Sequence, residues 1–387
     1  MNTEREIKYT CAVVPCRDYS ERETGSALTR ALASIEGLDF VRPGMKIVIK
    51  ANLVAAMKPE AAATTHPALV TALVKMLTER GAKVVVGDSP GGLFTVAALN
   101  GVYRATGMTE TEAAGAELNR NIGYHKHVIN GNTMKELTYT DYLDDCDAII
   151  DFAKLKAHGM IGMSAAVKNL YGVIPGLLKP ETHYVYPDPE DFADMLIDIN
   201  EYFRPKLRLA LIDAVVGMEG NGPTAGTPKE IGALIAARTT YEADAAAARL
   251  IGLKTEDVPT LAAAKRRGLC PDGISLYGDP DSLAVKDFES VPRRSITSFG
   301  STRGKFIKRF VDRTLSHKPA PIKMKCVACK KCMDLCPAKA ITMVKRGKYT
   351  FPKIDRSKCI KCFCCQEFCP KGAMIVKRNP LMKLLQR

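Results

Sequence analysis

The sequence predicts an α/β protein with a largely parallel sheet and helices on both faces, followed by a small cysteine-rich α+β module. Two observations predict this division. Over roughly the first 290 residues, short apolar segments of strand length alternate with segments whose apolar residues recur at helical spacing. Strands separated by helices favour a parallel sheet that is covered on both sides. Beyond residue 322 the pattern changes, and nine cysteines fall within 44 residues.

The expected elements of the larger part follow from apolar spacing. Residues 67–80 carry apolar side chains three and four positions apart and end before Gly81, which is typical of a helix end. A second helix is expected in the alanine-rich segment 243–253. The expected strands are 7–14, 45–49, 83–86, 146–152, 207–212 and 233–237.

Two copies of one cysteine spacing, C-x2-C-x2-C-x3-C-P, lie 33 residues apart. Each copy matches the ligand run of bacterial iron–sulphur proteins. Four thiolates also suit zinc, but zinc motifs usually pair two C-x2-C knuckles rather than three evenly spaced cysteines. The cysteines of the two copies are Cys326, Cys329, Cys332 and Cys336, then Cys359, Cys362, Cys365 and Cys369.

Through these motifs, residues 323–378 resemble the two-cluster ferredoxins. The resemblance implies two 4Fe–4S clusters, which typically relay electrons. We expect crossed ligation, because the proline after each fourth cysteine turns the chain toward the other cluster. The ninth cysteine, Cys364, is expected to be a spare thiol. The expected ligands are Cys326, Cys329, Cys332 and Cys369 for one cluster, and Cys359, Cys362, Cys365 and Cys336 for the other.

Charge divides the chain as sharply as the cysteines do. Residues 293–387 hold 25 Lys/Arg against 4 Asp/Glu, a net of +21, whereas residues 1–292 hold 31 against 38, a net of −7. Such a positive field steers acidic molecules, so we expect an acidic redox protein as partner. We expect no nucleic-acid partner, because no recognition motif is present and few aromatic residues accompany the basic ones.

The expected domains are an α/β domain (1–290), a basic linker with an amphipathic helix (291–322), the ferredoxin-type module (323–378) and a basic tail (379–387). The amphipathic helix would pack on a neighbouring domain or make a peripheral contact with a membrane. No transmembrane segment and no secretory signal are expected. A cytoplasmic location, in an anaerobe, fits these features and the oxygen-labile clusters.

In such a sheet, ligands bind beyond the carboxyl ends of the strands, and polar or glycine-rich segments fall at several of these ends. These segments resemble the domain-of-unknown-function family numbered three-six-two, whose name assigns no reaction. The resemblance therefore implies an architecture rather than an activity. Its segments are Lys50-Ala51-Asn52, 64–67 with 87–91, 154–158 with 167–172, and 217–223.

Residues in these segments are candidates for a small-molecule pocket whose further cofactor is unknown. Imidazoles and amines there could bind an anion, exchange protons or ligate a metal. The loop 87–92 would either cradle a phosphate or form a tight turn, and His125 and His127 are expected to be structural. The candidates are His158, Lys168 and His183 for catalysis, and Lys50, Asn52, Asp88, Gly91, Glu219 and Asn221 for cofactor binding.

Three hypotheses of function remain open from the sequence. The first is a ferredoxin-coupled oxidoreductase whose clusters serve the pocket. The second is a non-enzymatic electron carrier or maturation partner that uses the α/β domain for docking. The third is a metallo-isomerase, because His158, Lys168, Pro175-Gly176 and His183 resemble the pattern of nickel-pincer lactate racemases. That resemblance implies a lysine-tethered cofactor and histidines that ligate metal or carry protons.

Overall fold

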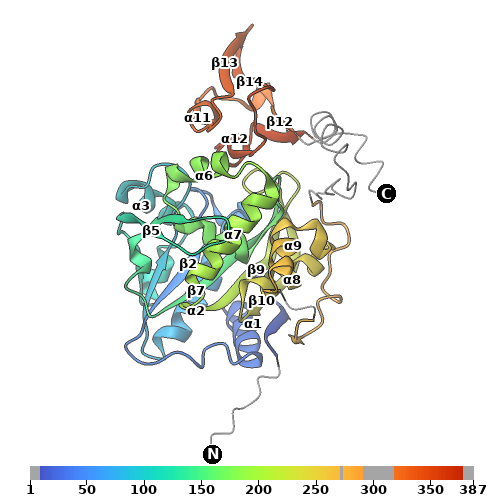
Figure 1. Cartoon of the computed structure of the whole chain (residues 1–387). Helices are drawn as coiled ribbons and strands as arrows, with labels where there is room; N and C mark the ends of the chain where they lie inside the picture. The colour runs from blue at the N-terminus through green and yellow to red at the C-terminus, as the bar shows by residue number, and fades with distance from the viewer. Residues whose placement is uncertain (1–8, 271–272, 291–317, 378–387) are drawn as a thin grey trace, which may run out of the picture.

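A nine-stranded sheet forms the centre of the larger domain in the computed structural model, which describes residues 9–270, 273–290 and 318–377 (Figure 1). Eight strands run in the order β11-β1-β10-β9-β7-β2-β3-β4, and β8 pairs with β7. The strands are β1 (Cys11–Pro15), β2 (Lys46–Ala51), β3 (Lys83–Gly87), β4 (Ala116–Leu118), β7 (Ala148–His158), β8 (Gly162–Ser164), β9 (Leu207–Glu219), β10 (Thr227–Ala237) and β11 (Leu276–Tyr277).

The expectation of a largely parallel sheet is confirmed. Five strand pairs are parallel, and three are antiparallel: β1 with β10, β10 with β9, and β7 with β8. Two of these antiparallel pairs, β9 with β10 and β7 with β8, arise where the chain returns by a hairpin instead of crossing over through a helix, whereas β1 and β10 are far apart in the sequence. The strand expected at 207–212 is longer in the structure, because β9 continues to Glu219.

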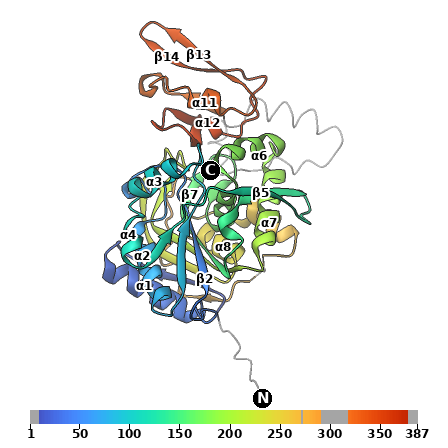
Figure 2. The same ribbon diagram turned by 90° about the vertical axis from the view of Figure 1, so that its left-hand side faces the viewer.

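Helices cover both faces of the sheet, as expected (Figure 2). Alternate residues of one strand serve opposite faces: Ile47 and Ile49 of β2 join one apolar cluster, and Val48 joins another. Helices α1 to α3 pack in the first cluster, whereas α7, α8 and α9 cover the opposite face. The helices are α1 (Glu21–Ser34), α2 (Pro67–Thr78), α3 (Val96–Ala105), α4 (Glu110–Ala113), α5 (Ala166–Asn169), α6 (Lys179–Val185), α7 (Pro189–Phe203), α8 (Thr240–Leu250) and α9 (Pro259–Arg266).

Strand β7 corrects one prediction. The segment 154–158, expected as a loop after a strand ending at residue 152, continues the strand to His158. Polar Lys154, Lys156 and His158 alternate there with Leu155 and Ala157, which is the period of a strand. The strand extends because β9 pairs with it beyond residue 152 and β8 pairs with its last three residues.

The cysteine-rich module sits over the edge of the sheet where the parallel strands end, above α6 (Figure 1). It consists of two short strand pairs and two one-turn helices. The two helices, α11 and α12, lie at equivalent positions of the 33-residue repeat. A separate hairpin, β5 (Tyr124–Val128) with β6 (Glu136–Thr140), lies on the side of the larger domain. The module's elements are β12 (Lys318–Pro321), α11 (Lys331–Asp334), β13 (Ile341–Arg346), β14 (Tyr349–Ile354), α12 (Cys364–Glu367) and β15 (Met374–Lys377).

Hydrogen bonds between side chains and backbone hold the module on the larger domain. Asn221, in the β9–β10 turn, donates to Met374 O (3.3 Å) and accepts from Val376 N (2.9 Å). Thr224 Oγ1 donates to Glu367 O (2.8 Å). From the module, the side-chain amide of Gln366 donates hydrogen bonds to the carbonyl oxygens of residues 221 and 222. The β9–β10 turn is therefore the main clasp between the two parts.

Glycine permits a close approach at a second contact. A Cβ atom on Gly91 would lie only 2.0 Å from Cε1 of Phe368. The loop after β3 thus receives an aromatic ring of the module at a position where a side chain would clash.

The expected linker helix within 291–322 and the tail 379–387 fall on 291–317 and 378–387, which lie outside the described residues. Among the described helices, none is both long and apolar enough to cross a membrane.

We predict that Asn221→Ala loosens the module without unfolding the larger domain. It removes two hydrogen bonds, each of which contributes about 1 kcal/mol, so docking should weaken roughly 30-fold. Hydrogen exchange at the Val376 amide should accelerate accordingly. Asn132→Ala, in the turn of the β5–β6 hairpin, is the control, and equal exchange in both variants would contradict this account of the clasp.

Candidate functional site

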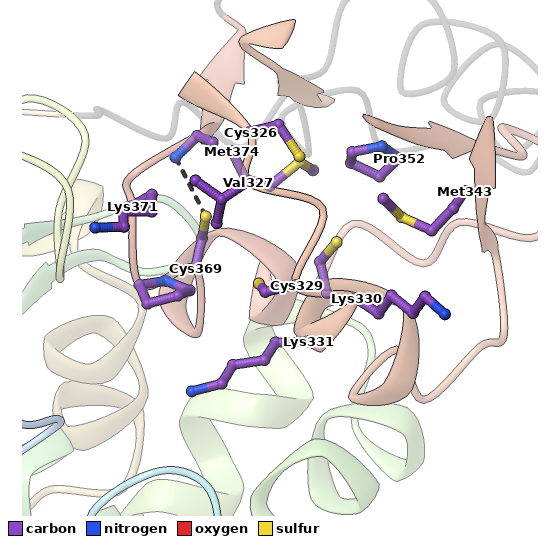
Figure 3. Close-up of a pocket in the computed structure, with 13 residues that line it drawn as sticks. Cys326, Val327, Cys329, Lys330, Lys331, Met343, Pro352, Cys369, Lys371 and Met374 are labelled. Atoms are coloured by element: carbon purple, nitrogen blue, oxygen red, sulfur yellow. Dashed lines mark hydrogen bonds between the residues drawn. The ribbon is translucent and has the colours of Figure 1, made fainter. Parts of the chain in front are cut away.

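The thiols of the module fall into two groups of four. Cys326, Cys329 and Cys332 line one pocket together with Cys369 from the second motif (Figure 3). The other group comes together around Cys365, whose thiol lies within electrostatic reach of Cys359, Cys362 and Cys336, and also of Cys332 from the first group. Cys359 in turn lies within reach of Cys362 and Cys336. Each group therefore takes three thiols from one motif and one from the other. Four convergent thiolates are the donor set that a 4Fe–4S cluster requires, so the residues fit the group.

The backbone around the cysteines repeats with the same 33-residue period. Left-handed φ angles occur at Ala328 (56°) and Lys361 (59°), and again at Lys330 (63°) and Phe363 (61°). Non-glycine residues rarely adopt this conformation, so its recurrence at equivalent positions indicates that both cysteine loops form the same turn. Successive N–H groups in such turns form concave nests that suit anionic clusters.

The fourth cysteine of each motif also receives a matching hydrogen bond. Ala340 N donates to Cys336 Sγ at 3.3 Å, and Ala373 N donates to Cys369 Sγ at 3.2 Å. Hydrogen bonds to ligand sulphur help to set the reduction potential of a bound cluster. Cys364 is fully buried beside these groups and lies outside both sets of four.

A second pocket lies where the module meets the larger domain, and residues of both parts line it. Its empty volume, including its mouth, is ≈ 440 Å³. From the module come Glu367 and Phe368, which stand between Cys365 and Cys369 in the sequence. We call this space the interdomain cavity. Its polar lining from the larger domain is Asn52, Asp88, Ser89, Lys156, Ser164, Lys168, Asn169, Tyr171 and Lys179.

Three lysines of the cavity come from three different elements. Lys156 is on β7, Lys168 is on α5 and Lys179 begins α6. The first turn of α5 is fixed because the carboxylate of Asp244, on α8, accepts hydrogen bonds from the N–H groups of residues 166 and 167. Chain segments far apart in sequence thus converge on one small volume.

These lysines are held mainly by neutral oxygens. Lys156 Nζ donates to Asn52 Oδ1 (2.7 Å) and Ala63 O (2.8 Å). Lys179 Nζ donates to Ser89 O (2.6 Å) and to the carbonyl oxygen of Ile174. The carboxylate that approaches Lys168 is Glu367, with Nζ and Oε1 3.9 Å apart. The cavity therefore concentrates positive charge.

Burial reshapes the titration of this cluster. Desolvation lowers the pKa of Lys156 to about 7, and the charge of Lys168 adds to the effect. Desolvation also lowers the pKa of Lys179 to about 7 against the opposing influence of Asp88. Burial alone would raise the pKa of Glu367, but the lysines, Lys168 foremost, hold it below its usual value. Each of these lysines is thus buried with little compensating charge.

Beneath the cavity, Lys50 and Asp88 form a buried ion pair with Nζ and Oδ1 2.7 Å apart. Asp88 also accepts hydrogen bonds from the N–H groups of Leu53 (2.6 Å) and Ser89 (2.8 Å). Asn169 joins the strands, because its amide contacts Asn52 (2.8 Å) and the β2 backbone. This network fixes the floor of the cavity, since its charged and polar groups are mutually satisfied.

The structure brings together only some of the candidate residues. Asn52, Asp88, Gly91 and Lys168 line the cavity, and Lys50 lies directly below it.

The other candidates lie outside that lining. His158 Nδ1 accepts from Met160 N at 3.1 Å, and buried His183 stacks on Phe192 at 4.4 Å between ring centroids. Burial lowers the pKa of His183 to about 4. Glu219 accepts from Glu289 N at 2.8 Å, and Asn221 forms the clasp described above. The pocket roles of these four residues stay predictions.

Sequence reasoning did not place Glu367 and Phe368 in this pocket, and it noted Lys156 and Lys179 only as cations close in sequence to His158, Lys168 and His183. The alternation of Lys154, Lys156 and His158 with apolar residues was an available signal for one polar strand face. Glu367 was detectable as one of four acidic residues in the basic region 293–387, but its contact with the larger domain depends on docking.

The fold and the four-cysteine groups define an iron–sulphur protein with a ferredoxin-type module, and comparisons agree. The 4Fe–4S dicluster domain matches residues 325–373. The domain of unknown function DUF362 matches residues 47–249, and the chain belongs to this family. Both resemblances inferred from the sequence are confirmed.

A relative supports the family assignment. The chain is 30% identical over 280 residues to a thylakoid-associated protein of Synechocystis sp., a match that covers 69% of this chain and 84% of the relative.

Two solved structures show remote similarity. A Thermotoga maritima protein matches 53% of this chain and 52% of its own, at 12% identity and a TM-score of 0.35. The lactate racemase apoprotein of Thermoanaerobacterium thermosaccharolyticum matches 60% and 55%, at 13% identity and a TM-score of 0.38. The chain thus spans little more than half the length of these structures.

We predict that serine substitutions reveal the crossed grouping of the thiols. Cys326→Ser and Cys369→Ser should each lose about half of the iron and leave the same residual EPR spectrum. Cys359→Ser and Cys336→Ser should share a different one, because the other group of four is broken. Cys364→Ser, the adjacent control, should keep its iron. A Cys369→Ser spectrum that matches that of Cys359→Ser would instead indicate uncrossed ligation.

Proposed function

We propose that this chain is an iron–sulphur oxidoreductase in which two 4Fe–4S clusters exchange electrons with a small anion bound in the interdomain cavity. One observation carries the proposal. Glu367 and Phe368 line the cavity. Glu367 is two positions after Cys365, and Phe368 directly precedes Cys369. These two cysteines belong to different groups of four thiols. The cavity is therefore adjacent to both expected electron carriers.

The charge of the cavity supports an anionic ligand. Asp88 is paired with Lys50 and also acts on Lys156 and Lys179, so two carboxylates, those of Asp88 and Glu367, stand against the three lysines of the lining and Lys50 below it. Buried charges are costly unless they are paired. A carboxylate or phosphate group would supply the missing negative charge and would also accept hydrogen bonds from the ammonium groups.

The protein's own groups have distinct tasks in this proposal. Lys168 and Lys179 bind and orient the anion, and Glu367 keeps Lys168 directed into the cavity. Lys156, whose pKa burial lowers to about 7, can hold or release a proton at neutral pH. Phe368 covers the cavity and excludes water. The clusters, when bound, supply or accept single electrons.

Electrons would arrive from an acidic redox protein. Around Cys326 and Cys329, several basic residues of the module are exposed, and Cys329 is itself exposed. A negatively charged partner would be steered toward this surface. The first group of thiols would thus receive the electrons, and the second would lie closer to the larger domain. The exposed basic residues are Lys323, Lys325, Lys330 and Lys331.

The proposal is tested by anaerobic purification, mass spectrometry of small molecules released from the protein, and reoxidation of the reduced clusters by the identified anion. We expect Lys168→Ala to lose the bound anion and to slow reoxidation at least tenfold, with iron content unchanged. Lys254→Ala, on the larger domain outside the cavity, should behave as wild type. Equal reoxidation in all three proteins, with no released anion, would favour a non-enzymatic electron carrier.

Anion affinity should also fall as pH rises. Lys156 and Lys179 titrate near pH 7, so they attract an anion below this pH and lose their charge above it. Malonate, which stays ionised from pH 6.5 to 9, should bind ~10- to 100-fold more weakly at pH 9 than at pH 6.5. Calorimetric titration measures this change. Lys156→Met should bind more weakly at pH 6.5 and show a shallower pH dependence, whereas affinity that rises with pH would contradict the assignment.

A further inference from the structure

A second cluster of metal-binding side chains lies on the β5–β6 hairpin, among residues that do not line the interdomain cavity. His125 and His127 are two positions apart on β5, so their side chains project from the same side of the strand. Asp144 approaches them from the turn after β6. One ligand atom from each of the three residues lies within 4.8 Å of the other two. The sequence had suggested a structural role for both histidines.

A hydrogen bond orients the first imidazole. Nδ1 of His125 lies 2.7 Å from Asp141 Oδ1, and its Nε2 lies 3.6 Å from Asp144 Oδ2. When Nδ1–H donates to Asp141, Nε2 presents a lone pair toward the second carboxylate. Histidines that ligate metals are typically held in this way, with the other ring nitrogen donating to a carboxylate.

The 3.6 Å separation between His125 Nε2 and Asp144 Oδ2 leaves room for a shared cation. It exceeds the usual length of an N–H···O hydrogen bond. It is close to the ~3.4 Å that separates two ligands of one tetrahedral zinc ion with bonds of about 2.1 Å. A lone pair and a carboxylate oxygen that face each other repel, and a shared cation would turn this repulsion into attraction.

The second imidazole and the carboxylate are also held in place. His127 stacks on Tyr139 with ring centroids 4.3 Å apart, and its ring centroid is 4.2 Å from that of His125. Within the described part of the chain, His127 Nε2 is buried and has no hydrogen-bond partner. The Tyr139 hydroxyl donates to Asp144 Oδ1, which leaves Oδ2 for the cluster. A buried nitrogen without a partner is costly, and a bound metal would remove that cost.

We propose that His125, His127 and Asp144 bind a divalent transition-metal ion of the zinc class, with Asp141 as the carboxylate that orients His125. Two imidazole nitrogens and one carboxylate oxygen suit zinc and its neighbours rather than magnesium or calcium. His125 and Asp144 are partly exposed, so a fourth position is open to solvent. Three protein ligands with an open position are typical of a reactive zinc site rather than a closed structural one. This site does not depend on the proposed redox function.

Zinc binding to the full, cluster-loaded protein tests this proposal. After equilibration with Zn²⁺ and dialysis, elemental analysis should find one zinc per chain in addition to the iron. We expect His127→Ala and Asp144→Asn each to weaken zinc binding at least tenfold without changing the iron content. Lys126→Ala is the matched control, because this residue is on the opposite face of the same strand and should leave zinc binding unchanged.

X-ray absorption at the zinc edge gives a readout that does not depend on the variants. A coordination shell of nitrogen and oxygen supports the site, whereas a sulphur shell would place the zinc on cysteines and overturn the proposal. Zinc content that is the same in wild type, His127→Ala and Asp144→Asn would overturn it as well.

Discussion

Burial of lysine side chains at the carboxyl edge of the sheet is the constraint on which the arrangement of this protein depends. The module covers this edge, and the lysine side chains below it are buried. Such charges need compensation. Glu367 supplies one carboxylate, and the lysines around it hold its pKa low. Glu367 reaches the lysines only when the module is docked, and docking in turn requires that Gly91 has no side chain. These features together allow the lysines to be buried.

The contact between the module and the larger domain is specific in its orientation. The two parts carry opposite net charges over the sequence, yet the contact is made by directed hydrogen bonds from Asn221, Thr224 and Gln366. Attraction between net charges has no preferred orientation, whereas amide and hydroxyl groups fix one. The electron route that we propose would need a fixed distance, and a directional clasp suits it better than a diffuse electrostatic contact.

Sequence predicted the covalent and periodic features well. The doubled cysteine spacing led to two mixed groups of thiols, and apolar periodicity led to the alternating sheet and helices. It could not reveal where β7 and β9 end, because those ends depend on pairing with β8 and β10. Nor could it show that Glu367 meets Lys168, since 199 positions separate them and their contact requires docking. His158 and His183 do not line the cavity, although His183 lies within electrostatic reach of Glu367 and Lys168.

The 33-residue repeat of the module has a consequence for its symmetry. The residues equivalent to Glu367 and Phe368 in the first half are Asp334 and Leu335, and Asp334 is exposed. An acidic residue followed by an apolar one thus occurs twice, but only the second copy serves as a plug for the larger domain. The two halves of the repeat therefore differ in their surroundings. Glu367 and Phe368 of the second half line the cavity at the larger domain, whereas Asp334 of the first half is exposed. The module, although nearly symmetric in its cysteine spacing, thus has one side that contacts the larger domain and another that is exposed.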